Sequence, residues 1–210
     1  MPALPKDGAQ AATGFDFTGH MRRFCHTLVA DLPELAHIDL EQVAIGFRQT
    51  RRRGTAGVQA TLTPLRFAGG SRTTKRRGRH WRIDPLHDET GREMLYLLSF
   101  YLPRFLETPF EERLITVMHE LWHISPEFNG DLRRFAGRCY AHSHSRDGYD
   151  REMAVMARRW LAGNPSPETY AFLRLDLTEL RRTHGPIRGL KYPTPKLRVI
   201  AGPENCSRPQ

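Results

Sequence analysis

Cysteine is scarce in this chain of 210 residues: Cys25, Cys139 and Cys206 lie far apart and form no CxxC pair. Their number and spacing exclude a disulfide framework and a four-cysteine zinc ribbon, and they suit a reducing compartment. No run approaches about eighteen apolar residues, which excludes a transmembrane helix. The first residues lack a basic segment followed by an apolar one, so we expect no secretory signal and a cytoplasmic protein.

Hydrophobic residues make up 39% of the chain and charged residues 26%, which is typical of a globular protein of one domain. Residues 1–14 are rich in Ala, Gly and Pro, and we expect them to be disordered. Residues 185–210 contain five prolines and are expected to form an extended basic tail. A single domain over residues 15–184 remains between these two ends.

The net charge of +9 is concentrated in one segment. Residues 48–82 contain eleven Lys or Arg and no Asp or Glu, whereas the rest of the chain carries 21 basic and 23 acidic residues. Strand-like runs at 43–47, 58–62 and 65–67 alternate with glycine-rich breaks, which predicts a basic antiparallel meander or hairpin with arginines at its turns. Such arginines either prevent edge-to-edge aggregation or contact the phosphates of a nucleic acid. No aromatic interleaving of the kind typical of single-strand binders strengthens the second interpretation.

Hydrophobic spacing predicts four helices, spanning residues 17–32, 108–124, 149–161 and 167–182. The second begins most clearly, with Thr108 as N-cap, Pro109 in the first turn and Glu111 completing a capping box. The run 94–102 is apolar throughout and is closed by Pro103, so it is either a buried strand or a short helix.

The run His119-Glu-Leu-Trp-His123 has the form HExxH and lies within the second predicted helix. Residues four apart project from one face of a helix, so the imidazoles of His119 and His123 can reach one metal ion. Zinc suits this pair, since a catalytic zinc site combines three protein ligands with a water molecule. Glu120 is turned about 100° around the helix axis, so it can approach that water and act as a general base. Two ordinary histidines on a structural helix are the alternative, which the well-capped start and the flanking apolar residues disfavour.

The third ligand must come from further along the chain, because Pro126 and Asn129 replace the glycine and histidine of the HExxHxxGxxH pattern. His142 is the first candidate and His144 the second, since both directly precede the third predicted helix. The alternative carboxylate ligands are Asp131, Asp147, Asp150 and Glu152.

Three further side chains near the motif have candidate roles. Tyr140 and Tyr149 could hydrogen-bond an oxyanion, although Tyr149 suits packing better. Asp150 could orient a ligating imidazole through its second nitrogen.

The run from His119 to Asp150 resembles a family of phage metallopeptidases and, more distantly, the SprT-like zincins. The resemblance extends from about Phe17 to about Arg159 and implies an α+β, zincin-like fold. In such a fold, helices pack on a small, mostly antiparallel sheet, and the HExxH helix is central and lies beneath an edge strand. By position, His119, His123 and His142 are similar to the metal ligands and Glu120 to the catalytic glutamate. SprT-like proteins often carry a cysteine zinc ribbon, which this chain lacks.

The sequence therefore predicts a zinc metallopeptidase that hydrolyses a protein or peptide substrate through a zinc-bound water activated by Glu120. The run 95–102 is expected to supply the edge strand along which the substrate pairs. The main alternative is a nucleic-acid-binding protein with a structural or vestigial zinc site, in which segment 48–82 contacts the nucleic acid. A protease that acts on DNA-bound proteins and a zinc hydrolase of non-peptide amides also fit the sequence. No membrane partner is expected.

Overall fold

The computed structural model describes residues 14–50, 54–134 and 146–200, leaving aside the side chains of residues 146–150. The helices are α1 (Phe17–Asp31), α2 (Arg104–Glu107), α3 (Phe110–Trp122), α4 (Arg146–Ala162), α5 (Pro167–Tyr170) and α6 (Leu177–His184). The strands are β1 (Phe15–Asp16), β2 (Val43–Gln49), β3 (Ala60–Pro64), β4 (Thr73–Arg76), β5 (Arg79–Ile83), β6 (Tyr96–Leu102), β7 (Ile187–Arg188) and β8 (Leu197–Ile200). The predicted α+β class is confirmed.

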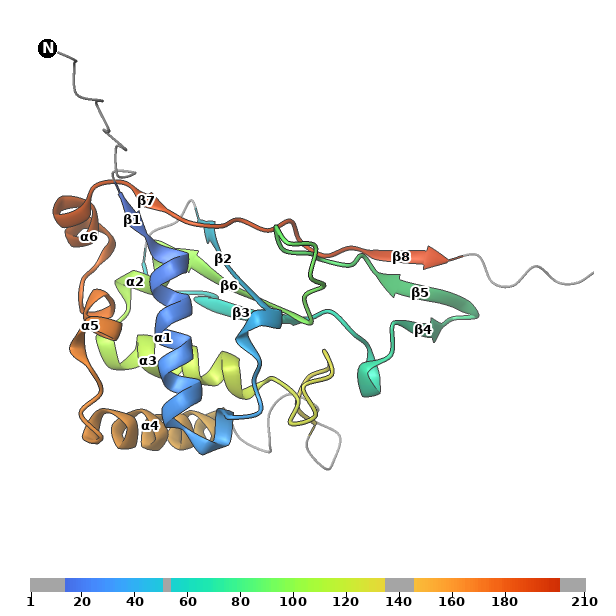
Figure 1. Ribbon diagram of the computed structural model, residues 1–210, viewed down its shortest axis with the longest axis horizontal. Helices are drawn as coiled ribbons and strands as arrows, with labels where there is room; N and C mark the ends of the chain where they lie inside the picture. Colours follow the sequence, from blue (N-terminus) through green and yellow to red (C-terminus); the bar gives the residue numbers. More distant parts are fainter. Residues whose placement is uncertain (1–13, 51–53, 135–145, 201–210) are drawn as a thin grey trace, which may run out of the picture.

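Three strands form the central sheet in the order β2-β6-β3 (Figure 1). β6 runs parallel to β2 and antiparallel to β3. Elsewhere in the described chain, β1 and β7 are parallel, while β5 is antiparallel to both β4 and β8. The central sheet is therefore mixed, and the two other sheets of the described chain are small and separate from it. The prediction of one mostly antiparallel sheet is wrong. It is wrong because the run 94–102 forms a central strand and inserts between two strands predicted to be neighbours.

The two faces of the central sheet differ because successive residues of a strand point to opposite sides. One face contributes to the main core the side chains of Val43, Ile45, Phe47, Tyr96, Leu98, Phe100 and Leu102. On the other face, Ala44 and Leu97 belong to a second, smaller apolar cluster, against which Tyr192 packs. Gly46 permits this close approach, since a Cβ there would lie 2.9 Å from the Tyr192 ring.

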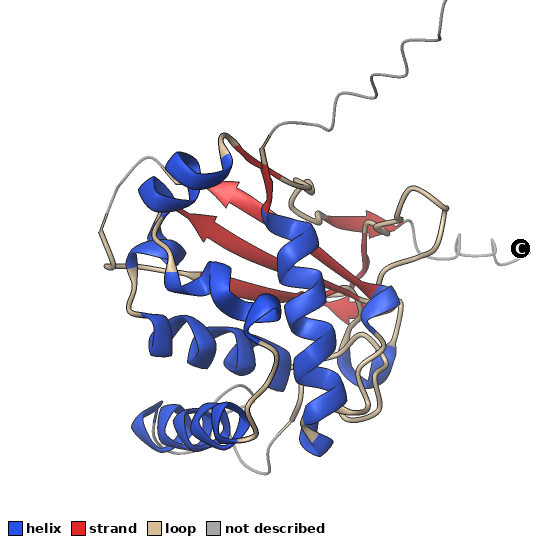
Figure 2. Ribbon diagram, turned by 60° about the vertical axis from the view of Figure 1, so that its left-hand side comes forward, coloured by secondary structure: helices blue, strands red, loops and turns tan. Residues whose placement is uncertain are grey.

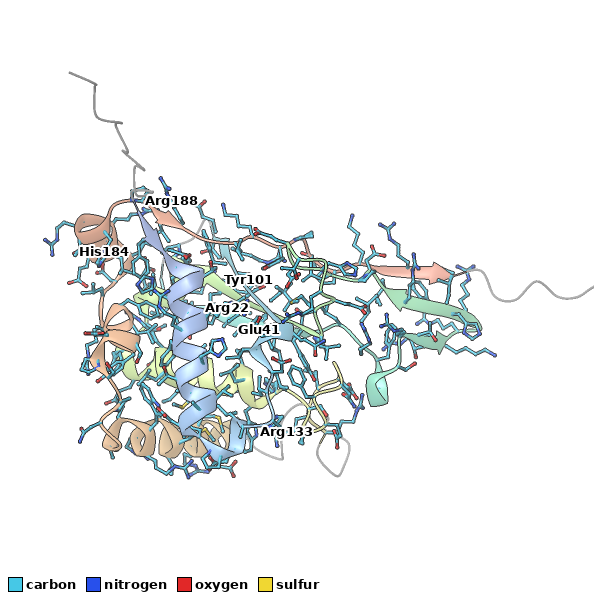
Figure 3. The ribbon with its side chains drawn as sticks, viewed as in Figure 1. Arg22, Glu41, Tyr101, Arg133, His184 and Arg188 are labelled. Carbon is cyan, nitrogen blue, oxygen red and sulfur yellow. The ribbon has the colours of Figure 1, made fainter. Side chains whose placement is uncertain are left out.

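Helices gather on one side of the central sheet, as the colouring of Figure 2 makes clear. The predicted helix 17–32 is confirmed as α1, whose stripe of Phe17, Met21, Phe24 and Leu28 is fully buried. Arg22 ties α1 to the start of β2, because its guanidinium donates to the carbonyls of Leu40 at 2.8 Å and Val43 at 3.3 Å (Figure 3).

α3 is the helix that carries the HExxH motif, and it begins differently from the prediction. Pro109 is its N-cap, and no side chain caps the helix there. Thr108 is buried, and its hydroxyl donates to the carbonyl of Phe105 at 2.8 Å, so the predicted capping box is wrong. The core side of α3 presents Arg113, Leu114, Val117, Met118 and Leu121, all of them buried.

The C-terminal part of the chain differs from the prediction in two ways: its helix is interrupted, and its extended tail pairs with strands of the domain. The single helix expected over 167–182 is divided into α5, a 3-10 turn (Ala171–Arg174) and α6, because Asp176 begins a new helix with a capping box. Within the expected tail, β7 pairs with β1 and β8 pairs with β5. The extended segment thus links the core to a second sheet. No described helix has the length and apolar character needed to cross a membrane.

The strands β4, β5 and β8 form a separate antiparallel sheet, which we call the basic arm, and it projects away from the helices (Figure 1). Arg77 and Gly78 connect β4 to β5 with positive φ values of 49° and 74°. This arginine-bearing hairpin is formed by strands that were not predicted, whereas the predicted strands 43–47 and 58–62 correspond to β2 and β3 and do not pair with each other. The predicted strand 65–67 is absent, and a 3-10 turn at Ala68–Gly70 leads into the arm instead.

Candidate metal centre

The two histidines of the motif converge at the C-terminal end of α3. His119 lies in the last turn of the helix, and His123 is its C-cap residue with helical dihedral angles. Their Nε2 atoms are 3.0 Å apart, and the rings are inclined at 81° with centroids 4.7 Å apart. Two zinc–nitrogen bonds at a tetrahedral angle would hold such nitrogens about 3.3 Å apart. The pair is thus close to the geometry of two metal ligands, although 3.0 Å also fits a hydrogen bond between one protonated and one unprotonated nitrogen.

Glu120 points from α3 toward β3. Its Oε2 accepts a hydrogen bond of 2.6 Å from the backbone N–H of Leu62. Burial raises the pKa of this carboxyl from 4.5 to about 7, and the bond from Leu62 opposes the rise only in part. A carboxyl that titrates near neutrality can both accept and return a proton, which is the property required of a general base that later acts as an acid.

Among the described strands, β3 lies at an edge of the central sheet. The carbonyl of Gln59 accepts from the N–H of Tyr101 on β6 at 2.9 Å, so residue 59 bonds toward the sheet. Because alternate residues of a strand bond in opposite directions, the peptide groups of Ala60 and Leu62 face outward. The bond from Leu62 to Glu120 agrees with this alternation. The edge strand predicted at 95–102 is therefore wrong: β6 is paired on both sides, and β3 is the strand beside the motif.

The backbone after the motif is held against the end of α3. The carbonyl of His123 accepts from the N–H of Arg133 at 2.8 Å, and Ile124 and Leu132 form an isolated antiparallel bridge. The Arg133 side chain donates from Nε to the carbonyl of Trp122 at 2.7 Å, and its guanidinium lies 4.1 Å from the centre of the Trp122 ring. These contacts fix the main chain of the second histidine.

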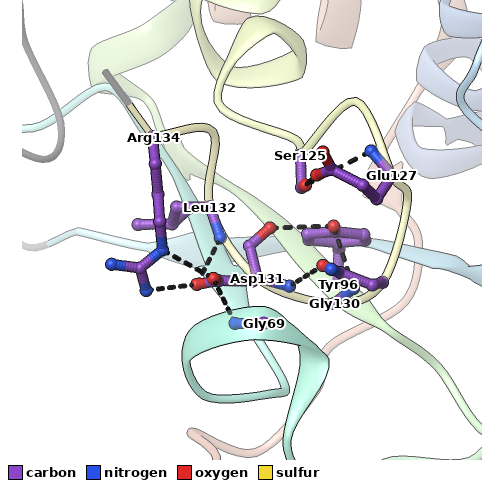
Figure 4. A network of polar contacts seen from close by, with 9 residues as sticks. Gly69, Tyr96, Ser125, Glu127, Gly130, Asp131, Leu132 and Arg134 are labelled. Atoms are coloured by element: carbon purple, nitrogen blue, oxygen red, sulfur yellow. Dashed lines mark hydrogen bonds and ion pairs between the residues drawn. The ribbon is translucent and has the colours of Figure 1, made fainter. Parts of the chain in front are cut away.

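A buried tyrosine fixes the far part of the same loop (Figure 4). The Tyr96 hydroxyl, from β6, donates to the carbonyl of Asp131 at 2.9 Å and accepts from the N–H of Gly130 at 3.0 Å. Burial of this fully buried side chain raises its pKa to about 12, so the hydroxyl stays protonated and can donate. The alternation of β6 toward the core identifies Tyr96 as buried, but its role in holding the loop required the structure.

Asp131, one of the predicted alternative ligands, has another role. Its carboxylate accepts from the N–H groups of Gly69 and Leu132, each at 2.9 Å, and from the guanidinium of Arg134 at 2.8 and 2.9 Å (Figure 4). Burial alone would raise its pKa, but the bonds from Arg134 and from these N–H groups hold the pKa below its usual value. Asp131 therefore joins the loop after the motif to the turn before the basic arm, and these partners already engage the carboxylate that was an alternative metal ligand.

The remaining candidates for the third ligand stay predictions. His142 and His144 lie outside the described residues, as does Tyr140, the candidate for oxyanion binding. Asp147, Tyr149 and Asp150 fall in the first turn of α4, where the side chains are not described. Glu152 lies on the surface of α4 and borders a hollow that Glu34 and Trp122 also line. Over 14–50, 54–134 and 146–200, no three His, Cys, Asp or Glu side chains are grouped so that they could hold a metal ion.

Comparison of the chain with known protein families finds no match, and neither do comparisons with curated proteins and with solved structures. The arrangement at the end of α3 combines two converging imidazoles, a carboxyl with a pKa near neutrality, and β3, an edge strand among the described strands.

Proposed function

We propose that the protein is a zinc-dependent metallopeptidase with a zincin-like fold, as the HExxH motif and the resemblance to phage metallopeptidases suggest. The observation that carries the proposal is the 3.0 Å separation of the His119 and His123 Nε2 atoms, because one tetrahedral ion can accept both nitrogens with only a small adjustment. The third ligand is proposed to be His142, with His144 as the alternative. Bound zinc would polarise the scissile carbonyl and make a neighbouring water more acidic.

Glu120 is the proposed general base. Its carboxylate takes a proton from the attacking water and delivers it to the leaving amine, and a pKa of about 7 in the metal-free protein suits both transfers. The N–H of Leu62 fixes one carboxyl oxygen, so that the other can approach the water. The substrate is proposed to pair with the outward peptide group of Ala60 and the outward carbonyl of Leu62 on β3, because the N–H of Leu62 is already donated to Glu120. This pairing places the substrate backbone beside the end of α3.

The proposal is tested by exposing the zinc-loaded protein to a broad peptide library. Glu120→Gln should retain zinc and lose nearly all cleavage, because an amide cannot accept the proton. Glu112→Gln is a matched control, since Glu112 is an exposed carboxylate in the first turn of the same helix. Zinc binding without any cleavage by the wild type, or full cleavage by Glu120→Gln, would contradict the proposal.

The rival functions predict different outcomes. A nucleic-acid-binding protein with a structural zinc would hold the metal and cleave nothing, whereas a hydrolase of non-peptide amides would spare the peptide library. A protease acting on DNA-bound proteins would cleave faster when DNA is present. Comparing His142→Ala with His144→Ala for metal content assigns the third ligand.

A further inference from the structure

The basic arm carries a concentration of positive charge that the body of the protein does not neutralise. Residues 73–83 contain five Lys or Arg and no Asp or Glu. Elsewhere in segment 48–82, Arg66 and Arg72 pair with Glu93 at 2.9 and 2.7 Å, and Arg48 donates to the carbonyl of Tyr192. Within the described part of the chain, no carboxylate forms an ion pair with the basic residues of the arm strands β4 and β5 or of their turn. The arm thus carries five cations of this segment that form no ion pair with a carboxylate of the described residues, while Arg51, Arg52 and Arg53 lie outside those residues.

The register of the arm separates its side chains onto two faces. Thr74 is opposite Trp81, which is in turn opposite Val199, so these three side chains share one face. Arg76 and Arg79, two residues further along each strand toward the turn, lie on the same face. The result is an aromatic ring flanked by two guanidinium groups at the free end of the arm.

This face is hollowed. A cavity of about 640 Å³ is lined by Phe67, Thr74, Arg76, Arg77, Arg79, Trp81 and Leu197. In the sequence Trp81 lies between Arg79 and Arg82, and the turn before β4 brings Phe67 to the same cavity. Leu197, which lines the cavity, and Val199, which lies opposite Trp81, remain 51% and 47% exposed. Such a surface offers rings, apolar side chains and cations together.

The arm is also held in a fixed position relative to the body. The N–H of Gly69, in the turn before β4, donates to Asp131 at 2.9 Å, and the N–H of Arg66 donates to the carbonyl of Gly130 at 3.0 Å. Within the arm, Arg198 of β8 forms an ion pair at 2.9 Å with Asp84, which directly follows β5, and so holds these two strands together. A ligand would therefore meet a preformed surface, which lowers the entropy cost of binding.

We propose that the hollow face of the basic arm binds single-stranded nucleic acid. The rings of Phe67 and Trp81 receive bases, because every base has a face that can stack on an aromatic side chain. The guanidinium groups of Arg76, Arg77 and Arg79 contact the phosphates, whose charge they complement. This binding is independent of peptide cleavage, so either activity can be present without the other.

The test uses the full chain and measures fluorescence anisotropy with labelled oligothymidylate, oligouridylate of equal length, and duplex DNA. The double variant Arg76→Glu, Arg79→Glu should weaken single-strand binding by about tenfold or more and reduce the salt slope by about 1.4. The matched control is Arg181→Glu, Arg182→Glu: it changes the net charge equally on exposed residues of α6, at the opposite end of the molecule (Figure 1). The control should bind nearly as wild type does.

Stacking is tested separately at Trp81. Trp81→Leu keeps an apolar side chain and should weaken binding about tenfold, whereas Trp81→Phe should restore most of it. Circular dichroism verifies that each variant is folded. Comparing the thymidylate and uridylate oligomers shows whether DNA or RNA is preferred.

The proposal would be overturned if the wild type did not bind single strands, or if the α6 control variant lost as much single-strand affinity as the arm variant. It would also be overturned if the wild type bound duplex DNA more tightly than single strands and Trp81→Leu bound single strands as the wild type does. Polyglutamate that competes as well as oligothymidylate at equal charge would also overturn it, because it would show that the arm binds any polyanion.

Discussion

Replacing Glu120 by glutamine should change the pH dependence of stability in the metal-free protein. In the folded chain, burial raises the pKa of this carboxyl to about 7, whereas the unfolded chain should titrate near the ordinary value of 4.5. Between these two values the folded state keeps a proton that the unfolded state has lost, so the wild type loses stability as the pH rises. At about 1.4 kcal/mol per pKa unit, the loss above pH 7 is between roughly 2 and 3 kcal/mol, since the side chain keeps some contact with solvent.

Glutamine removes the charge but keeps an oxygen that can accept from the N–H of Leu62. Glu120→Gln should therefore match the wild type near pH 5 and exceed it by roughly 2–3 kcal/mol near pH 9. The assay is urea denaturation followed by circular dichroism after removal of metal, with Glu112→Gln as the exposed control that should follow the wild type at every pH. A difference that does not change with pH, or a wild type more stable than the variant at high pH, would refute the reasoning.

Three further substitutions test how the loop after the motif and the last helix are held, each by chemical denaturation of the purified variant. Gly130→Ala should cost at least about 2 kcal/mol, because φ is 85° and a Cβ would lie 2.5 Å from Cγ of Arg66; an unchanged midpoint would contradict this. Tyr96→Phe leaves the N–H of Gly130 and the carbonyl of Asp131 without the hydroxyl that they share, and should cost about 2 kcal/mol. Asp176→Ala removes the side-chain cap of α6 and should cost about 1 kcal/mol, whereas an equally stable variant would show that the cap is dispensable.

The helices of the core were predictable because their signals are local. The stripe from Phe17 to Leu28 and the HExxH spacing both follow from 3.6 residues per turn. The capping box of α6 was also readable, since Asp176 and Glu179 are three residues apart. The sequence interpretation missed it because apolar residues continue through the break.

The sheet order was not predictable in the same way. β2 and β6 pair across some fifty residues, for example Val43 with Tyr96, and nothing local in either strand specifies the partner. The capping prediction at Thr108 failed because two local hydrogen bonds compete for its hydroxyl. The hydroxyl donates to the carbonyl of Phe105 and does not cap α3. At the candidate metal centre, the motif indicated His119, Glu120 and His123, but the bond from Leu62 depends on which strand forms the edge.

Zinc binding measured per chain tests the central claim most directly. Purified wild type, stripped of metal and titrated with zinc, should take up one ion per chain, and Glu120→Gln should do the same. His119→Ala and His123→Ala should each lose that ion, whereas His26→Ala, which alters an exposed histidine of α1, should retain it. A wild type that takes up no zinc, or uptake that survives both motif substitutions, would contradict the claim that these two imidazoles hold a metal.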